Sequence, residues 1–219
     1  MKNKIKDLLI VIPAYNEGKY IKKVLLKTNK LANILVIDDG SNDKTLTIAK
    51  KYATHIIRNS TNKGYDYTII KGLKWSSKIS RYKYVITFDA DNQHRQKYII
   101  KLYKKISNSN YDCVIGSRNY LNRKSEYIIS SISKKIFKIS DPLTGMKIYN
   151  MNKIKKKIRQ IDKTKVYLGM HFLILDISYS SIKIYVNKKK KSIMGFGLKA
   201  EILFIKTFIN ILIRKIFFQ

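Results

Sequence analysis

Five short apolar runs recur through the first 116 residues, and each has the length of a β-strand. Between them lie segments whose apolar residues recur at helical spacing. The expected strands cover 8–12, 33–38, 55–58, 84–88 and 112–116, and the expected helices 18–30, 42–53, 66–78 and 97–106. Strands that are apolar throughout are typical of a parallel sheet that is buried on both faces. The pattern therefore predicts an α/β fold with a mostly parallel central sheet and helices on both faces.

The alternation of strands and helices weakens after residue 116. The pattern there predicts a helix, a turn, a strand and a basic loop, over 125–139, 141–145, 181–186 and 187–191. Residues 197–218 predict a long helix whose polar stripe of Lys206, Asn210 and Arg214 is narrow. Such a helix packs on the core, pairs with another subunit, or lies flat at a membrane interface.

Composition is that of one sizeable folded domain. The chain has 219 residues, of which 45% are hydrophobic, and this is enough for a packed core. The single cysteine, Cys113, cannot form an internal disulfide, which fits a reducing cytosolic compartment. We expect no secretory signal, and no spanning helix because no stretch reaches about 18 uncharged apolar residues.

The formal net charge of +32 bears on partners rather than on the fold. Nucleic acid, an anionic membrane surface and phosphorylated substrates all attract such a chain, and an AT-rich genome would also produce an excess of lysine. A nucleic-acid-binding protein would cluster its basic residues on one groove-facing element, with aromatic residues between them. Here the lysines are spread along the whole chain, so we do not expect a nucleic-acid partner.

Polar residues follow each of the five expected strands. These segments read "PAYNE" (13–17), "DDGS" (38–41), "NKG" (62–64), "DADNQH" (89–94) and "GSR" (116–118). Any single acid among them suits a turn or a helix cap. Ligands of an open parallel sheet bind outside the carboxyl ends of its strands, so the whole set predicts a binding site on that rim.

Asp89 and Asp91 raise the sharpest question, because two carboxylates this close repel each other. In extended geometry, residues two apart point the same way. Carboxylate oxygens suit Mg²⁺ or Mn²⁺, which proteins often hold through one or two carboxylates and the phosphates of a substrate. A divalent cation carrying a diphosphate would relieve the repulsion.

The ordered set of motifs resembles the family 2 glycosyltransferases with the GT-A fold, above all their dolichyl- and polyprenyl-phosphate sugar transferase branch. The segments that carry the resemblance lie within residues 7–150: "VIPAYNE", "VIDDGSNDKT", "NKG", "FDADNQH", "IGSR" and "DPLTGMK". The resemblance implies a nucleotide-sugar donor, UDP- or GDP-linked, and Mg²⁺ or Mn²⁺. It implies donor-binding roles for Pro13, Tyr15, Glu17, Asp39, Lys63 and Asp89, metal-binding roles for Asp91, Gln93 and Asp89, and catalytic roles for Asp89, Asp91, Arg118 and Asp141.

The acceptor side departs from the family pattern. The family usually has "SGFR" where this chain has "TGMK", so Lys147 replaces an arginine, and an acid of a later helix is replaced around Met170–His171. Hydroxyl-acceptor members commonly carry a late Glu-Asp pair as base, and this chain has none. A phosphate acceptor needs positive charge instead, which Arg118, Arg123, Lys147 and Lys189 would supply.

We therefore expect a lipid-phosphate acceptor, with a sugar hydroxyl as the alternative acceptor class. His94 and His171 suit packing or hydrogen bonding better than base catalysis. The expected organisation is a GT-A domain over 1–196, with a donor half to about residue 118 and an acceptor half over 119–196. The amphipathic helix 197–219 would dock on an anionic membrane surface, which places the protein in the cytoplasm, at the inner face of the membrane.

Overall fold

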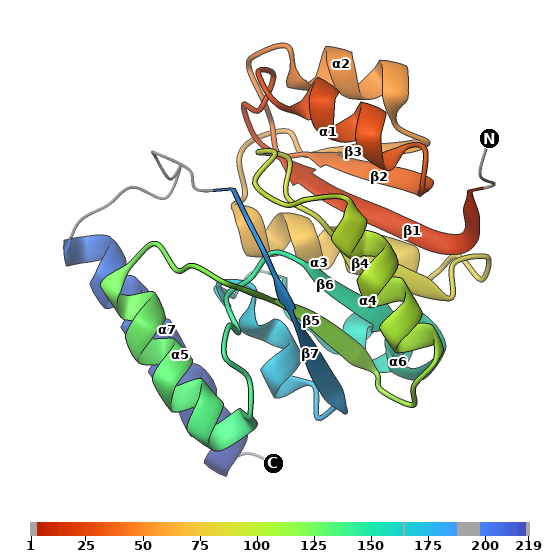
Figure 1. Ribbon diagram of the computed structural model, residues 1–219. Coiled ribbons are helices and arrows are strands. Elements are labelled where there is room, and N and C mark those ends of the chain that lie inside the picture. Colours follow the sequence, from red (N-terminus) through yellow and green to blue (C-terminus); the bar gives the residue numbers. More distant parts are fainter. Residues whose placement is uncertain (1–3, 164, 188–197, 218–219) are drawn as a thin grey trace.

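A seven-stranded sheet forms the centre of the molecule, in the order β3-β2-β1-β4-β6-β5-β7 (Figure 1). The computed structural model describes residues 4–163, 165–187 and 198–217. The strands are β1 (Ile5–Ala14), β2 (Ala32–Asp38), β3 (His55–Arg58), β4 (Tyr84–Thr87), β5 (Cys113–Arg118), β6 (Lys147–Asn150) and β7 (Tyr179–Ile184). β6 runs antiparallel to β4 and β5, and the other neighbours are parallel. The predicted α/β fold with a mostly parallel sheet is confirmed.

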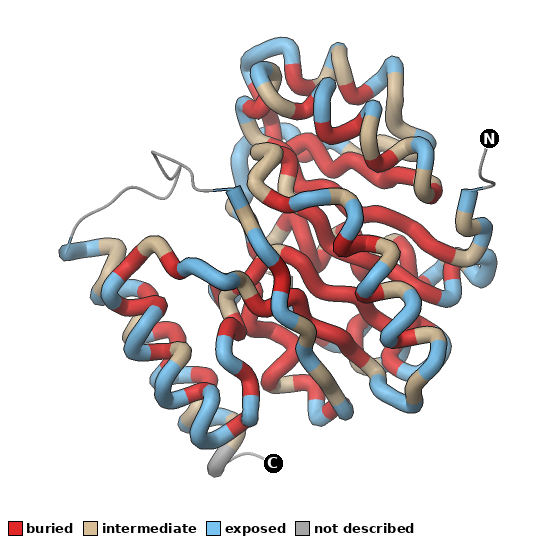
Figure 2. Tube along the Cα trace, viewed as in Figure 1, coloured by how far each residue is buried: buried red, intermediate tan, exposed pale blue. Residues whose placement is uncertain are grey.

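Helices cover both faces of this sheet, as the continuous apolar strands predicted. They are α1 (Ile21–Thr28), α2 (Thr45–Tyr52), α3 (Tyr65–Ser76), α4 (Lys97–Ser107), α5 (Lys124–Phe137), α6 (Met151–Gln160) and α7 (Leu198–Phe217), with a 3₁₀ helix η1 (Met170–Ile174). Ile10 of β1 packs in one core cluster with α1, α2 and α4, and Val11 in another with α3, α6 and η1. Successive strand residues point to opposite faces, so β1 contributes to both cores and is buried along most of its length (Figure 2).

Elements up to residue 118 lie close to their predicted positions, and the later ones were predicted less completely. β6, α6 and η1 were not expected. The expected strand 84–88 ends one residue earlier, at Thr87, so Asp89 follows the strand and Asp91 lies in the turn after it. The expected helix 125–139 corresponds to α5 and the expected strand 181–186 to β7.

α7 packs against α5 and η1, and α5 and α7 lie side by side (Figure 1). Phe204, Phe208 and Ile211 of α7 are buried in the α3-side core, so this helix is part of the folded domain. The other side of α7 exposes apolar residues, and α5 does the same. Among the helices described, none is both long enough and apolar enough to cross a bilayer.

The order of the strands indicates where a binding site lies in the sheet. β1 lies between β2 and β4, so the chain leaves β1 toward one edge of the sheet and later returns on its other side. In open α/β sheets, a crevice forms outside the carboxyl ends of the strands at such a switch point. The turns after β1, β2 and β4 carry the acidic motifs, and they meet there.

Candidate active site

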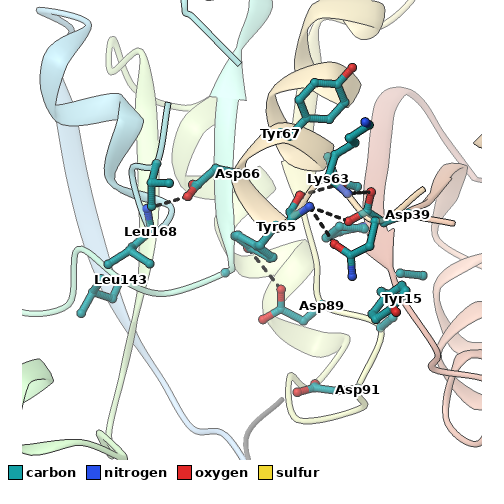
Figure 3. Close-up of a pocket in the computed structure, with 18 of the residues that line it drawn as sticks. Tyr15, Asp39, Lys63, Tyr65, Asp66, Tyr67, Asp89, Asp91, Leu143 and Leu168 are labelled. Atoms are coloured by element: carbon teal, nitrogen blue, oxygen red, sulfur yellow. Dashed lines mark hydrogen bonds between the residues drawn. The ribbon is translucent and has the colours of Figure 1, made fainter. Parts of the chain in front are cut away.

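A cavity of about 860 Å³ opens at the carboxyl ends of the parallel strands (Figure 3). Ten residues predicted from the sequence line it: Pro13, Tyr15, Glu17, Asp39, Lys63, Asp89, Asp91, Gln93, Arg118 and Arg123. Asp141 and Lys147 are not part of its lining, and Lys189 lies outside the described residues. The structure therefore brings most of the predicted residues into one cavity, while their individual roles stay predictions.

Asp39 follows β2 and organises the loop that leads into α3. Its carboxylate accepts hydrogen bonds from the backbone N–H groups of Lys63 and Gly64, both at 2.9 Å, and from Nδ2 of Asn59 at 2.7 Å. Gly64 has a φ of 90°, which glycine adopts without steric cost. This carboxylate thus holds the "NKG" loop at the edge of the cavity.

The turn after β1 is held against the start of α2. The backbone N–H of Asn16 donates to Ser41 Oγ at 3.0 Å, and that of Glu17 donates to Thr45 Oγ1 at 2.8 Å. Asn16 has a φ of 53°, a left-handed conformation that asparagine tolerates better than most residues. These bonds keep Tyr15 and Glu17 in the cavity wall next to Asp39.

Asp89 lies on the floor of the cavity and is held from several sides. His94 Nε2 donates to its Oδ2 at 3.0 Å, and the Tyr65 hydroxyl donates to its Oδ1 at 3.3 Å. Burial opposes ionisation of Asp89, but the hydrogen bond from His94 and the charges of Arg118 and Lys147 hold the pKa of this carboxyl below its usual value. Asp89 is therefore ionised and fixed in orientation. His94 acts as a hydrogen-bonding residue, as expected.

Asp91 lines the same cavity, two residues after Asp89. Its Oδ1 accepts a hydrogen bond from the backbone N–H of Gln93 at 3.0 Å, and Asn92 between them has a φ of 62°. The side chain is partly exposed and lines the cavity with Asp89. Within the described part of the chain, no three His, Cys, Asp or Glu side chains come together as a metal site. Two carboxylates facing one cavity suit an ion that also takes oxygens from a substrate diphosphate.

Arg118 is oriented by a forked ion pair with Asp141. Nε of Arg118 lies 2.7 Å from Oδ2 of Asp141, and Nη2 lies 3.0 Å from Oδ1. Burial opposes the charge of Arg118, but Asp141 and Glu126 raise the pKa of the guanidinium above its usual value. Asp141 is almost completely buried. Asp141 was predicted to be catalytic, and the geometry gives it the role of positioning Arg118 at the cavity.

Lys147 was expected to bind the acceptor phosphate, and the structure places it elsewhere. Its side chain points into the core from the first residue of β6, where Nζ donates to the backbone carbonyl of Thr144 and lies 5.3 Å from the ring centroid of Phe172. Burial lowers the pKa of its ammonium to about 8. Lys147 is therefore buried outside the cavity lining, and its charge acts on Asp89 without contact with the cavity.

The other end of the cavity contains residues that the sequence reading missed. Glu126 of α5 lies 3.5 Å from Nη2 of Arg118 and accepts the backbone N–H of Asn122 at 2.8 Å. The remaining residues of this end are basic or apolar: Leu143, Lys163, Lys165, Val166, Leu168, Leu203 and Phe204. Leu143 belongs to the "DPLTGMK" segment, and the others come from the irregular segment before η1 and from α7, which carry no motif. The guanidinium of Arg123 lies 4.9 Å from the ring centroid of Phe204.

Comparisons with known proteins agree with the fold and the motifs. The family model of glycosyl transferase family 2 matches residues 9–176, and the chain belongs to this family. An uncharacterised protein of Methanocaldococcus jannaschii is 33% identical, over 81% of this chain and 84% of its own length. A UDP-N-acetylglucosamine–dolichyl-phosphate N-acetylglucosaminyltransferase of Methanococcus voltae is 28% identical, over 71% of this chain and 74% of its own.

Solved structures resemble the chain in fold at low sequence identity. Glucosyl-3-phosphoglycerate synthase from Mycobacterium tuberculosis, in complex with UDP, superposes with a TM-score of 0.71 at 14% identity, covering 94% of this chain and 80% of that one. A crystal structure of the same enzyme with Mn²⁺, UDP and phosphoglyceric acid gives a TM-score of 0.72 at 13% identity, covering 96% and 78%. The protein is a family 2 glycosyltransferase with the GT-A fold.

Proposed function

We propose that the protein transfers a sugar from a UDP- or GDP-linked donor to the phosphate of a polyprenyl phosphate at a membrane surface. The observation that carries the proposal is the two-sided cavity. One end holds Asp39, Asp89 and Asp91, and the other holds basic and apolar side chains such as Arg123, Leu203 and Phe204. A polar donor and an amphipathic acceptor need these opposite surroundings. Curated relatives named for dolichyl- or polyprenyl-phosphate substrates support this choice.

The acidic end suits the nucleotide sugar and a divalent cation. Asp91 would hold Mg²⁺ or Mn²⁺ with support from Asp89 and Gln93, while Tyr15, Glu17 and Asp39 would contact the nucleoside. The bound ion would supply positive charge to the leaving diphosphate. His94 and Tyr65 keep Asp89 fixed for this role.

The transfer itself needs little proton chemistry from the protein. A phosphate monoester is already anionic near neutral pH, because its second pKa is about 6. Its oxygen would form the new bond to the anomeric carbon while the bond to the diphosphate oxygen breaks, and the electron pair leaves with the nucleoside diphosphate. Attack from the face opposite the leaving group inverts the configuration. Arg118, held by Asp141, and Arg123 would position the incoming anion.

Glu126 is the observation that favours the alternative, a sugar-hydroxyl acceptor. Its carboxylate lies at the cavity and would be in place to accept a hydroxyl proton. However, the carboxylate of Glu126 already pairs with Arg118 and accepts the N–H of Asn122, so it is engaged by groups of the protein itself. Glu126→Gln separates the two functions, because transfer to a phosphate should largely survive and transfer to a hydroxyl should be lost.

A lipid acceptor would bring the protein to a membrane, and α5 and α7 offer a surface for it. Exposed apolar residues lie on both helices: Tyr127, Ile128, Ile132 and Ile136 on α5, and Ile202, Leu203, Ile209 and Ile213 on α7. Exposed lysines of the same helices, such as Lys134 and Lys206, would meet anionic headgroups. Leu203 also lines the cavity, so this surface leads to the acceptor end. We propose peripheral docking through this face.

A donor screen tests the first half of this function. Calorimetric titration with UDP, GDP and their common sugar conjugates, with and without Mn²⁺, should find one nucleotide bound in a metal-dependent way. Asp91→Asn should lose the metal dependence and keep the fold, as judged by circular dichroism. Metal-independent binding that is unchanged in Asp91→Asn would refute the assignment of the acidic end.

A further inference from the structure

The start of α3 connects the opposite walls of the cavity through three consecutive residues. The backbone N–H of Gly64 donates to Asp39 on the donor side, and the hydroxyl of Tyr65 donates to Asp89 on the floor. Asp66 turns the other way, toward the segment that precedes η1 (Figure 3). Asp39 and Asp89 belonged to recognised motifs, whereas Asp66 did not.

The carboxylate of Asp66 accepts three backbone hydrogen bonds from consecutive residues. Its Oδ2 accepts the N–H groups of Tyr167 at 3.0 Å and Leu168 at 2.8 Å, and its Oδ1 accepts that of Gly169 at 2.8 Å. Asp66 and these residues are buried. A buried backbone N–H without a partner is costly, so the carboxylate supplies what this stretch of backbone needs.

The same stretch has an unfavourable backbone shape. Leu168 has a φ of 50° and Gly169 a φ of 79°, and a left-handed conformation is uncommon for leucine. Such a conformation persists when the surroundings hold it in place. The three bonds to Asp66 are contacts of that kind, and they bracket Leu168 on both sides.

This segment forms part of the acceptor end of the cavity. Lys165, Val166 and Leu168 line the cavity, and Lys163 places its ammonium 4.7 Å from the ring centroid of Tyr67, the neighbour of Asp66. Together with Lys163, the segment therefore brings two basic groups and two apolar ones to the end where an amphipathic acceptor would lie.

We propose that Asp66 is a positioning residue for the acceptor: it holds segment 165–169 in the shape that binds the acceptor, and it has no direct part in donor binding. The proposal rests on the function proposed above for its choice of acceptor. Within the part of the chain that the structure describes, the three side-chain hydrogen bonds of Asp66 all go to the acceptor segment. Loss of the carboxylate should consequently weaken acceptor binding selectively.

Asp66→Asn is the primary test, because asparagine has the same size as aspartate but only one accepting oxygen. Its amide oxygen can still accept backbone N–H groups of the segment, whereas its NH₂ group faces a backbone N–H that it cannot accept. With geranylgeranyl phosphate as acceptor, its KM should rise about tenfold, since loosened positioning groups have effects of this order. The dissociation constant for the nucleoside diphosphate that the wild type binds, UDP or GDP, should stay within about twofold by calorimetry, well below the roughly 1.4 kcal/mol of a tenfold change. Amide hydrogen exchange at 167–169 should accelerate.

Gly169→Ala provides a second route to the same segment and leaves the carboxylate in place. A β-carbon there would meet its nearest neighbours at 3.6 Å or more, so the substitution acts through the φ of 79°. It should also raise the acceptor KM and spare binding of the nucleoside diphosphate. Asp112→Asn is the matched control, because Asp112 likewise accepts a backbone N–H, that of Ser178 at 2.8 Å. Asp112 precedes β5, at the end of that strand opposite to Arg118 and the cavity. Its kinetic constants should not change.

The outcomes separate this inference from the proposed function. Wild-type protein that ignores geranylgeranyl phosphate would refute the acceptor class, and hydrogen exchange would still report whether Asp66 holds the segment. If the wild type is active and Asp66→Asn keeps its acceptor KM, or if binding of the acceptor and of the nucleoside diphosphate weakens equally, the positioning role is wrong. Unchanged exchange at 167–169 would contradict it as well.

Discussion

Gly145 and Asp89 are packed so closely that residue 145 has no room for a side chain. A β-carbon at Gly145 would overlap both carboxylate oxygens of Asp89 and lie 2.6 Å from its Cγ. His94 and Tyr65 hold the same carboxylate from other directions, so it cannot move away freely. The glycine of "DPLTG" therefore determines where Asp89 sits.

Gly145→Ala should displace Asp89 and reduce the rate of transfer by about 100-fold, because a shift of roughly 1 Å in a positioned group has an effect of that size. Steady-state kinetics with a UDP- or GDP-sugar donor measures the loss. Gly116→Ala is the matched control, since a β-carbon there would crowd Ile184 at 3.0 Å in the core without touching Asp89. It should lower stability and spare the rate. Equal rates for the two variants would contradict the role of Gly145.

The pair of Arg118 and Asp141 should be strongly coupled in stability. Both side chains are largely buried, and removing one partner of such a pair commonly costs about 3–5 kcal/mol, because it leaves a buried charge uncompensated. Asp141→Leu should therefore lower the free energy of unfolding by about 3 kcal/mol. The double variant Arg118→Met/Asp141→Leu should lose less than the sum of the single variants. Urea unfolding followed by circular dichroism gives these values, and additive losses would contradict the coupling.

His171 should make the protein sensitive to acid. It is buried, and its Nε2 lies 3.0 Å from the hydroxyl of Tyr149. Burial, together with the charge of Lys147, lowers its pKa to about 3 from a usual 6.5. Because folding lowers the pKa of this histidine, the folded protein keeps its full stability above pH 6.5. The free energy of unfolding then decreases progressively as the pH falls from 6.5 toward 3. Near pH 4 the loss should reach about 3 kcal/mol.

The measurement is the free energy of unfolding as a function of pH in wild type and in His171→Gln. The variant should show a flatter profile below about pH 6.5, since glutamine does not take up a proton in this range. His55→Gln is the control: His55 Nε2 also lies against a tyrosine hydroxyl, that of Tyr82 at 2.9 Å, but its ring is less buried. It should change the profile less. Identical slopes in wild type and His171→Gln would show that His171 is not the sensitive group.

The exposed apolar face of α5 and α7 should bind anionic lipid. Deleting α7 is a poor test, because Phe204 and Phe208 belong to the core. Substituting Ile132, Ile136, Ile209 and Ile213 by serine leaves the core intact and should reduce flotation with anionic liposomes at least about tenfold, since binding scales with buried apolar area.

The control variant is Leu26→Ser, at an exposed position of α1. It tests whether removing any exposed apolar side chain lowers flotation. This variant should float with liposomes as the wild type does. Circular dichroism first establishes that both variants are folded. A folded quadruple variant that still floats like the wild type would remove α5 and α7 from the docking model.

The donor half was predictable because its determinants are local. Most of the apolar runs up to Cys113 are continuous, and the motif residues stand directly or shortly after the strands, so topology alone brings them to one rim. β6 was not predictable in this way. Its four residues include a lysine, and its place between β4 and β5 depends on antiparallel pairing with strands far away in the sequence.

The acceptor half depends on long-range contacts that no motif reports. Asp66 shapes the segment around Leu168, and Glu126 reaches Arg118 from a helix that carries no motif. Lys147 stands at a motif position that suggested phosphate binding, but its strand directs it into the core. Charge at a motif position therefore did not establish contact with the cavity.

The most direct test of the proposed function compares two acceptors that differ in one group. Purified protein, Mn²⁺ and a radiolabelled donor are mixed with geranylgeranyl phosphate or with geranylgeraniol, and label entering the lipid fraction is measured in a single turnover. We expect transfer to the phosphate alone, with the opposite anomeric configuration to the donor, and loss of this transfer in Asp91→Asn. Transfer to geranylgeraniol or to a soluble sugar hydroxyl, with none to the phosphate, would contradict it.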